Sequence, residues 1–194
     1  MALAAAAAAG ASDPLAIATE VDGHAENAAA SLLGGLVVAS VDVRDGIIVR
    51  PLVLDDQWRF VVVIPDEELA TVDARRVLPS SVPFSDAVHN LSAMGFLIAG
   101  LADHHGFVAS AMDDNLHQPY RMSLLPFAEP LLATLREAGA AGSCWSGAGS
   151  TMLGLCLPDT AHDVAIAARE FLAARSVPGT VLTLEADRTG LVVL

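Results

Sequence analysis

The sequence contains no lysine: all ten of its basic residues are arginine, against 23 acidic residues. A chain without lysine cannot use a lysine Schiff base or a phosphate-binding lysine. The formal net charge of −13 repels phosphate backbones, so nucleic-acid binding is not expected. Only two cysteines occur, Cys144 and Cys156, and they make neither a CxxC pair nor a zinc-ligand set. We interpret both as buried, small apolar residues of a cytoplasmic protein.

Long hydrophobic runs are also missing, although 54% of the 194 residues are hydrophobic and the mean hydropathy is +0.53. The longest apolar stretches, Leu32–Val41 and Phe60–Ile64, fall short of the roughly 18–20 residues that span a bilayer, so no membrane span is expected. No basic residue precedes Arg44, which argues against a secretory signal. The length suits one domain or one and a half.

The first third of the chain predicts helices followed by a hairpin. Asp13 is a helix N-cap followed by Pro14 at the first helical position, and an Asp-Gly turn at Asp45-Gly46 joins two β-rich segments. The predicted helices cover residues 2–9, 15–21 and 26–33, and the predicted strands cover residues 36–43 and 47–54.

From residue 58 onward, the order of predicted elements is strand, helices, strand, strand, helix, strand. This is the split βαβ order of an α+β sandwich, with helices on one face of an antiparallel sheet. A polar gap near Leu54–Trp58 sets the expected domain boundary, giving domains 1–56 and 57–194. The predicted strands are 58–64, 140–143, 152–157, 180–186 and 191–194, and the predicted helices are 67–78, 85–101, 107–112, 128–138 and 163–174. One face of the longest helix carries Val88, Leu91, Ser92, Gly95, Phe96 and Ala99.

Two clusters in the first half are candidates for chemistry. In Asp22–Asn27, His24 and Asn27 would hydrogen-bond a polar ligand at a helix N-terminus; alternatively, this segment only starts the helix. The adjacent arginines Arg75 and Arg76 would clamp a carboxylate or phosphate; alternatively, they form a solvated helix face with Asp73 at i,i+3.

Two further clusters lie in the second half. Leu116–Arg121 is a dense polar set that predicts either a binding loop or a satisfied helix end. Ser143–Thr151 is a turn of small residues that admits an anion to backbone amides, or brings two backbones close together. His89, His104 and His105 are interpreted as surface or core histidines, because adjacent histidines on a helix point to different sides and no third ligand has metal-site spacing.

Taken together and in this order, the clusters resemble homoserine kinases, which share a small-molecule kinase superfamily with galactokinase, mevalonate kinase and phosphomevalonate kinase. The family's Leu-His-Gln-Pro-Tyr-Arg is matched fully. Its Asn-Leu-Ser recurs unchanged. Its Glu-Gly-His-Pro-Asp-Asn and Ser-Gly-Ala-Gly-Pro-Thr segments are matched with a few substitutions, among them Ala25, Glu26 and Ser150. The matching segments are Asp22–Asn27, Ile64–Pro79, Asn90–Ser92, Leu116–Arg121 and Ser146–Thr151.

The resemblance implies both a fold and a reaction. The fold is the C-terminal part of a ribosomal-protein-S5-like unit over residues 1–56, followed by a ferredoxin-like split βαβ sandwich over residues 57–194. The reaction is ATP-dependent phosphorylation of the L-homoserine hydroxyl with Mg²⁺, giving O-phospho-L-homoserine in threonine biosynthesis. The implied protein is cytoplasmic and a possible homodimer.

The resemblance also assigns residues. His24, Asn27, Arg75 and Arg121 would bind the substrate, and Glu20 is the candidate magnesium ligand. The segment that would shape the nucleotide site consists of Ser146, Gly147, Ala148 and Gly149.

The family's nucleotide loop, Pro-x-x-x-Gly-Leu-Gly-Ser-Ser, would lie before residue 1. We therefore expect the chain to correspond to roughly the C-terminal two thirds of such a kinase, and to bind ATP weakly by itself. Two other interpretations remain open: a non-catalytic small-molecule-binding domain descended from such a kinase, and a kinase of the same superfamily that acts on another small alcohol.

Overall fold

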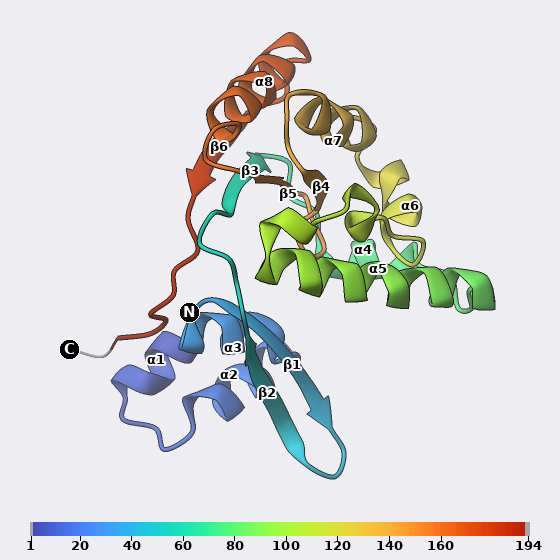
Figure 1. The fold of residues 1–194 in the computed structure, drawn as a ribbon. Coiled ribbons are helices and arrows are strands. Elements are labelled where there is room, and N and C mark those ends of the chain that lie inside the picture. The colour runs from blue at the N-terminus through green and yellow to red at the C-terminus, as the bar shows by residue number, and fades with distance from the viewer. Residues whose placement is uncertain (1, 193–194) are drawn as a thin grey trace. The chain divides into compact units, whose positions relative to one another are not determined.

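The computed structural model describes residues 2–192, and the chain divides into two compact units (Figure 1). The first unit combines Met1–Leu54 with Ala186–Leu194, and the second unit is Asp55–Glu185. The final segment of the chain thus returns to the first unit. None of the helices described is long and apolar enough to cross a membrane.

The first unit consists of three short helices and a β-hairpin. Asp13 caps the second helix, because its carboxylate accepts the N–H of Ala16 at 2.9 Å, as the Asp-Pro pair predicts. A small core forms around Leu3, Ala18 and Ala28. All five elements lie within a few residues of their predicted positions: α1 (Ala2–Ala8), α2 (Pro14–Asp22), α3 (Glu26–Leu33), β1 (Leu36–Asp42) and β2 (Gly46–Leu52).

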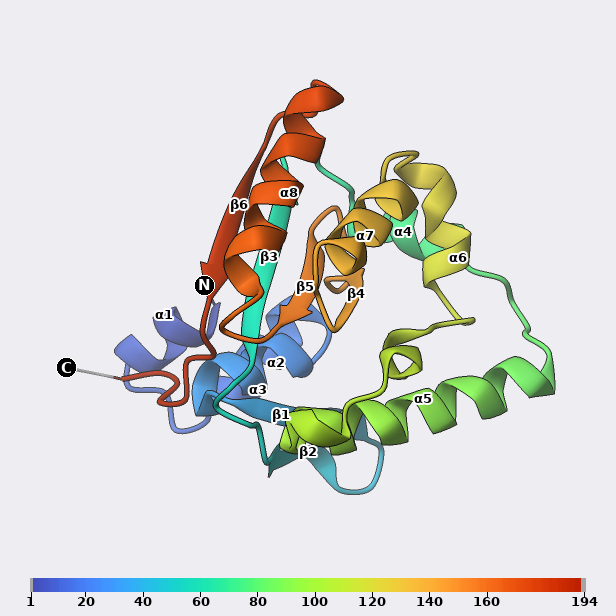
Figure 2. The same cartoon turned by 45° about the horizontal axis from the view of Figure 1, so that its top comes forward.

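The second unit is built on a four-stranded antiparallel sheet in the order β4-β5-β3-β6. Val61 and Val63 of the central strand are fully buried against two helices, and Figure 2 shows α8 lying along β3 and β6. The expected combination of helices with antiparallel sheets is confirmed. The strands are β3 (Arg59–Pro65), β4 (Gly142–Trp145), β5 (Met152–Cys156) and β6 (Gly179–Leu184), and the two helices are α7 (Ala128–Glu137) and α8 (Ala161–Ala174).

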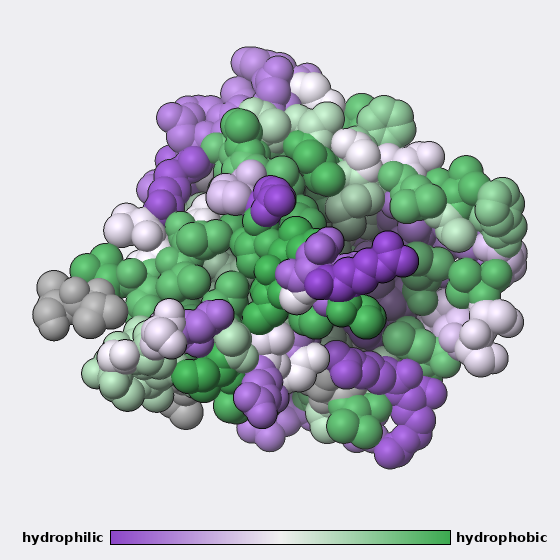
Figure 3. Space-filling view, turned by 90° about the horizontal axis from the view of Figure 1, so that it is seen from below, coloured by the Kyte–Doolittle hydropathy of each residue, from purple (hydrophilic) through white to green (hydrophobic). Residues whose placement is uncertain are grey.

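The long helix α5 (Phe84–Ala102) buries a different face from the one its apolar pattern predicts. Its buried residues are the small Ala93 and Gly100, whereas Leu91 of the predicted face is 75% exposed. Small side chains let the backbone of the helix approach its neighbours closely, and the larger side chains then remain at the surface. Figure 3 shows many hydrophobic side chains, in green, at the molecular surface.

The prediction of a helix over 107–112 is wrong. The chain forms two 3-10 turns instead, η1 (His104–Gly106) and η2 (Ala109–Met112). The reason is tertiary packing: Phe107 folds back onto Gly100, where a Cβ atom would lie only 2.7 Å from the phenylalanine ring. The ring of Phe107 also packs edge-on against the buried Trp58, with ring centroids 5.2 Å apart.

Two other predicted elements also differ. Helix α4 (Thr71–Arg76) is shorter than the predicted 67–78. Leu191 and Val192 are not in a strand, and residues 193–194 of that predicted strand lie outside the described residues. Two short elements complete the second unit, α6 (Gln118–Arg121) and η3 (Met122–Leu124).

Candidate active site

Helix α6 places a buried arginine at the centre of the second unit's polar cluster. Arg121 is only 8% exposed. Its Nε donates to the carbonyl of Ala74 in helix α4 (3.2 Å), and its Nη1 donates to the carbonyl of Gly147 in the β4–β5 loop (3.0 Å). Segments distant in sequence are thereby joined around one guanidinium, whose position is fixed by neutral oxygens.

The adjacent residues Arg75 and Arg76 make different interactions. The sequence left open whether they bind an anion or form a solvated helix face. Arg76 pairs with Asp73 at 3.0 Å and i,i+3 spacing on the exposed face of α4, as the structural alternative predicts. Arg75 acts electrostatically on Arg121. Burial lowers the pKa of Arg121 from its ordinary value, the Arg75 charge lowers it further, and the Asp114 charge opposes both effects. Among the residues described, neither Arg75 nor Arg121 forms an ion pair with a carboxylate.

Asp114 organises the segment that leads into α6. Its carboxylate accepts the backbone N–H groups of Leu116, His117 and Gln118, and the side-chain amide of Asn90 at 2.7 Å. Burial by itself would raise the pKa of Asp114, but these four donors outweigh it and hold the pKa below its ordinary value. Asp114 is therefore an ionised, almost fully buried anchor for the start of the helix.

His117 links Asp114 to Arg121. Its Nδ1 lies 3.2 Å from Nη1 of Arg121 and 3.6 Å from the Asp114 carboxylate. A guanidinium has only donors, so Nδ1 accepts and the imidazole is neutral. Burial is the main effect and lowers the pKa of His117; the Asp114 charge raises this pKa, and the Arg121 charge has a smaller lowering effect.

Two side-chain amides hold the segment that contains Asp114, His117 and Arg121 in place. Gln118 accepts the backbone N–H of Trp145 in β4 at 3.0 Å, which attaches α6 to the sheet. Asn90 of α5 accepts the backbone N–H of Asn115 at 2.8 Å in addition to its bond to Asp114. The predicted site residues did not include Asn90, Asp114, His117 and Gln118. Asn90 lies in the Asn-Leu-Ser motif, and His117 and Gln118 lie in the Leu-His-Gln-Pro-Tyr-Arg motif, whereas Asp114 lies in neither.

The segment Ser146–Gly149 forms the tight connection between β4 and β5. Gly147 and Gly149 have φ values of +59° and +88°, which favour glycine, and a Cβ atom on Gly149 would lie 2.5 Å from the Trp145 ring. The carbonyl of Gly147 accepts from Arg121, as described above. The structure thus brings Arg75, Arg121 and this loop together in the second unit.

The other predicted site residues lie in the first unit. His24 follows Gly23, whose φ of +76° closes α2, and its Nδ1 is 3.4 Å from the Glu26 carboxylate without hydrogen-bond geometry, so this buried nitrogen has no partner among the described residues. Asn27 lines a hollow of about 290 Å³. Glu20 is exposed near the end of α2.

Cys144 and Cys156 are free thiols, and burial raises the pKa of each to about 11. We expect the folded chain to react with a disulfide reagent at pH 8 about 100-fold more slowly than free cysteine, because the thiolate is the reacting species. The measurement is the rate of thionitrobenzoate release, with the urea-unfolded chain as control. Rapid labelling of the folded chain would contradict burial of these thiols.

Comparison with known proteins identifies the family. Residues 100–174 match the family described as GHMP kinases C terminal. The chain is 37% identical over 179 residues to homoserine kinase of Picosynechococcus sp., covering 92% of this chain and 58% of that protein. It is 40% identical over 149 residues to homoserine kinase of a Synechococcus strain, covering 76% and 49%. The solved homoserine kinase of Cytophaga hutchinsonii superposes with a TM-score of 0.81 at 26% identity, over 92% of this chain and 58% of that one.

With residues 100–174, the chain therefore carries the C-terminal domain of the GHMP kinase family. Within this family it is similar to homoserine kinases, and the predicted resemblance is confirmed. The chain spans between about half and three fifths of the length of these relatives.

Proposed function

We propose that this chain carries the amino-acid-binding half of a homoserine kinase, which transfers the γ-phosphoryl group of ATP to the L-homoserine hydroxyl. The observation that carries the proposal is the pair of guanidinium groups, Arg75 and Arg121, that have no carboxylate partner among the residues described. A buried cation without a counter-ion is costly, and an anionic ligand relieves that cost. The α-carboxylate of homoserine is such an anion.

In this proposal, Arg121 is the rigid element of the clamp. Two carbonyls and His117 already hold its Nε and Nη1, which leaves Nη2 for the substrate. Arg75 is exposed and supplies a second, adaptable charge. Such a charge-assisted contact fixes the substrate at one end and leaves its hydroxyl end to be directed to the phosphoryl donor.

The remaining assignments rest on the family resemblance. His24 and Asn27 would contact the substrate, and Ser146, Gly147, Ala148 and Gly149 would shape the site beside the nucleotide. Glu20 would be a magnesium ligand; its exposed carboxylate has the oxygen donors that Mg²⁺ prefers. When bound, Mg²⁺ offsets phosphate charge, which is the chief electrostatic requirement of phosphoryl transfer.

The fold and setting are proposed on the same basis. The order β4-β5-β3-β6 supports a ferredoxin-like split βαβ sandwich for the C-terminal domain over residues 57–194, and residues 1–56 would be the C-terminal portion of an S5-like domain. A role in threonine biosynthesis in the cytoplasm and a homodimeric state remain predictions.

A matched pair of arginines tests the carboxylate clamp. Calorimetric titration with L-homoserine should show affinity about tenfold weaker for Arg75→Ala, because one charge near the carboxylate is lost, and unchanged for Arg76→Ala. L-homoserinol, which lacks the carboxylate, should bind weakly to wild type and show no dependence on Arg75. Equal binding of homoserine and homoserinol would refute the proposal. ADP release from ATP and Mg²⁺, with and without L-homoserine, measures the reaction itself.

A further inference from the structure

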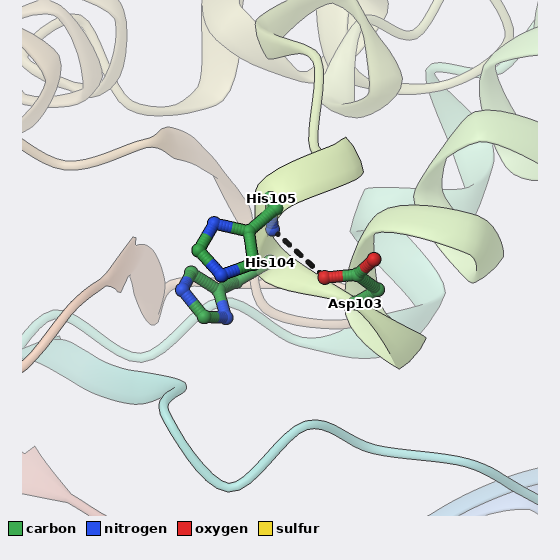
Figure 4. A group of neighbouring side chains, drawn as sticks. All are labelled: Asp103, His104 and His105. Carbon is green, nitrogen blue, oxygen red and sulfur yellow. Dashed lines mark hydrogen bonds between the residues drawn. The ribbon is translucent and has the colours of Figure 1, made fainter.

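The 3-10 turn η1 places two histidines and an aspartate side by side at the end of α5 (Figure 4). The sequence-based interpretation that His104 and His105 diverge assumed a helix, and it is wrong here. Their ring centroids are 3.9 Å apart and the rings are tilted by 36°. Asp103 precedes them, and its carboxylate accepts the backbone N–H of His105 at 3.1 Å.

His104 is oriented by a carboxylate from another segment of the second unit. Nδ1 of His104 lies 2.6 Å from Oδ2 of Asp55, and the same oxygen accepts the backbone N–H of His104 at 2.9 Å. The Nδ1–H donation fixes the tautomer and leaves Nε2 as the lone-pair nitrogen. Metal-binding imidazoles usually donate their other ring N–H to a carboxylate in this way, which fixes the orientation of the ring.

The three side chains place possible metal-ligand atoms near one another. Asp103, His104 and His105 each offer one ligand atom, and these atoms all lie within 4.8 Å of one another. Ligand atoms about 3.4 Å apart satisfy a tetrahedral ion with bonds of about 2.0–2.1 Å. Asp103 and His105 are exposed, so rotation of their side chains closes that gap without moving the core.

We propose that Asp103, His104 and His105 bind a divalent transition-metal ion of the zinc type, with water completing the coordination. Two imidazoles and one carboxylate suit Zn²⁺, Co²⁺, Ni²⁺ or Cu²⁺, whereas Mg²⁺ prefers an all-oxygen set. The site is separate from the proposed magnesium ligand Glu20 and does not depend on the proposed kinase activity. The ion has a structural role. Because only the folded chain binds it, the ion stabilises turn η1, which connects α5 to Phe107.

The test is titration of the chelator-treated chain with Zn²⁺ by calorimetry. We expect one site with Kd on the order of micromolar, because three protein ligands lie on a partly exposed turn. His105→Ala removes an exposed imidazole, and Asp103→Asn replaces an exposed carboxylate with a neutral amide; each change should weaken Zn²⁺ binding about tenfold or more. His162→Ala removes an exposed histidine on α8 and is the matched control; it should leave the affinity unchanged.

A second measurement uses the neighbouring indole. The His104 ring lies edge-on to Trp58 with centroids 6.3 Å apart, so Cu²⁺ at this site should quench tryptophan fluorescence in wild type and His162→Ala but much less in His105→Ala. Zinc should also raise the unfolding midpoint of wild type and not of His105→Ala. Zinc affinity that is the same in wild type, His105→Ala and Asp103→Asn, or no binding at all at 100-fold above the expected Kd, would overturn the proposal.

Discussion

Replacing Arg121 with methionine is expected to weaken L-homoserine binding about 100-fold or more, the largest effect of any single side chain in the proposed site. Methionine keeps much of the aliphatic volume and removes every donor of the guanidinium. A charge-assisted hydrogen bond to a carboxylate contributes about 1.5–3 kcal/mol, and the variant loses the Nη2 donor together with the positive charge. Calorimetry with L-homoserine measures the loss directly.

The expected size of this effect follows from how Arg121 is held. It is 8% exposed, and its Nε and Nη1 are fixed by the carbonyls of Ala74 and Gly147. A ligand therefore meets a preorganised donor and does not have to order a mobile side chain. The same bonds make the residue structural, so methionine should also lower the free energy of unfolding by about 1–3 kcal/mol, since two carbonyls lose a donor.

Two variants separate binding from stability. Arg121→Lys keeps the charge but has no planar fork to reach both carbonyls and the ligand, so we expect affinity between those of wild type and Arg121→Met. Arg76→Met removes an exposed arginine from the same cluster and should leave both affinity and stability unchanged. If Arg121→Met remains folded and binds L-homoserine within threefold of wild type, the carboxylate is bound elsewhere.

Local sequence signals predicted most of the elements. The Asp13-Pro14 pair gave the start of α2, and the Asp45-Gly46 pair gave a hairpin that pairs Asp42 with Gly46. These signals work because capping and turn geometry depend on a few neighbouring residues. The antiparallel sheet with helices in the second unit also agrees with the α+β interpretation.

Features set by tertiary contacts were not predictable in the same way. The burial of Ala93 and Gly100 on α5 depends on which segments approach the helix, and the break before Phe107 depends on its packing against Gly100 and Trp58. The periodicity of apolar residues shows which face of a helix is apolar but not which segments pack against it. It therefore predicted burial of the face that includes Leu91, which is exposed.

In the candidate site, too, local sequence motifs indicated some residues, whereas the contacts between them became known only from the structure. The motif Leu116–Arg121 drew attention to Arg121, which is buried in the structure. Of the adjacent pair, the charge of Arg75 acts on that guanidinium, whereas Arg76 pairs with Asp73. Asp114 was overlooked because it stands two residues before the motif. An aspartate shortly before a Pro-containing helix start is itself a capping signal, and it would have identified this residue.

Replacing Asp114 with alanine is expected to lower the free energy of unfolding by about 2–4 kcal/mol. The change leaves the N–H groups of Leu116, His117 and Gln118 and the amide of Asn90 without their acceptor. Buried donors without partners cost about 1–3 kcal/mol each, and partial access of water or local relaxation reduces the sum. Urea unfolding at pH 7 measures the difference, and Asp113→Ala, an exposed neighbour, is the control that should change little.

The pH dependence of the free energy of unfolding tests whether Asp114 stabilises the fold through its negative charge or only through packing. The pKa of Asp114 in the folded chain lies below its ordinary value of 3.8, so the unfolded chain binds the proton more readily in that range. Its contribution to stability is therefore complete above about pH 4 and is lost as the pH falls through the folded pKa. The stability difference between wild type and Asp114→Ala should be constant from pH 7 to 8, where His117 is neutral in both, and should shrink below pH 4 as Asp114 itself takes up a proton.

His117 adds a second pH-dependent contribution to the stability of the same segment: the folded chain favours its neutral form, whereas it favours the ionised form of Asp114. The folded pKa of His117 is below 6.5, chiefly because of burial, so the folded chain favours the neutral ring. Stability from this group is complete above pH 6.5 and declines as the pH falls toward the folded pKa, because the unfolded chain takes up the proton first. Removing Asp114 takes away the charge that favours His117 protonation, so this decline should be steeper in Asp114→Ala than in wild type. An identical slope in both between pH 6.5 and 5 would show that Asp114 does not act on His117.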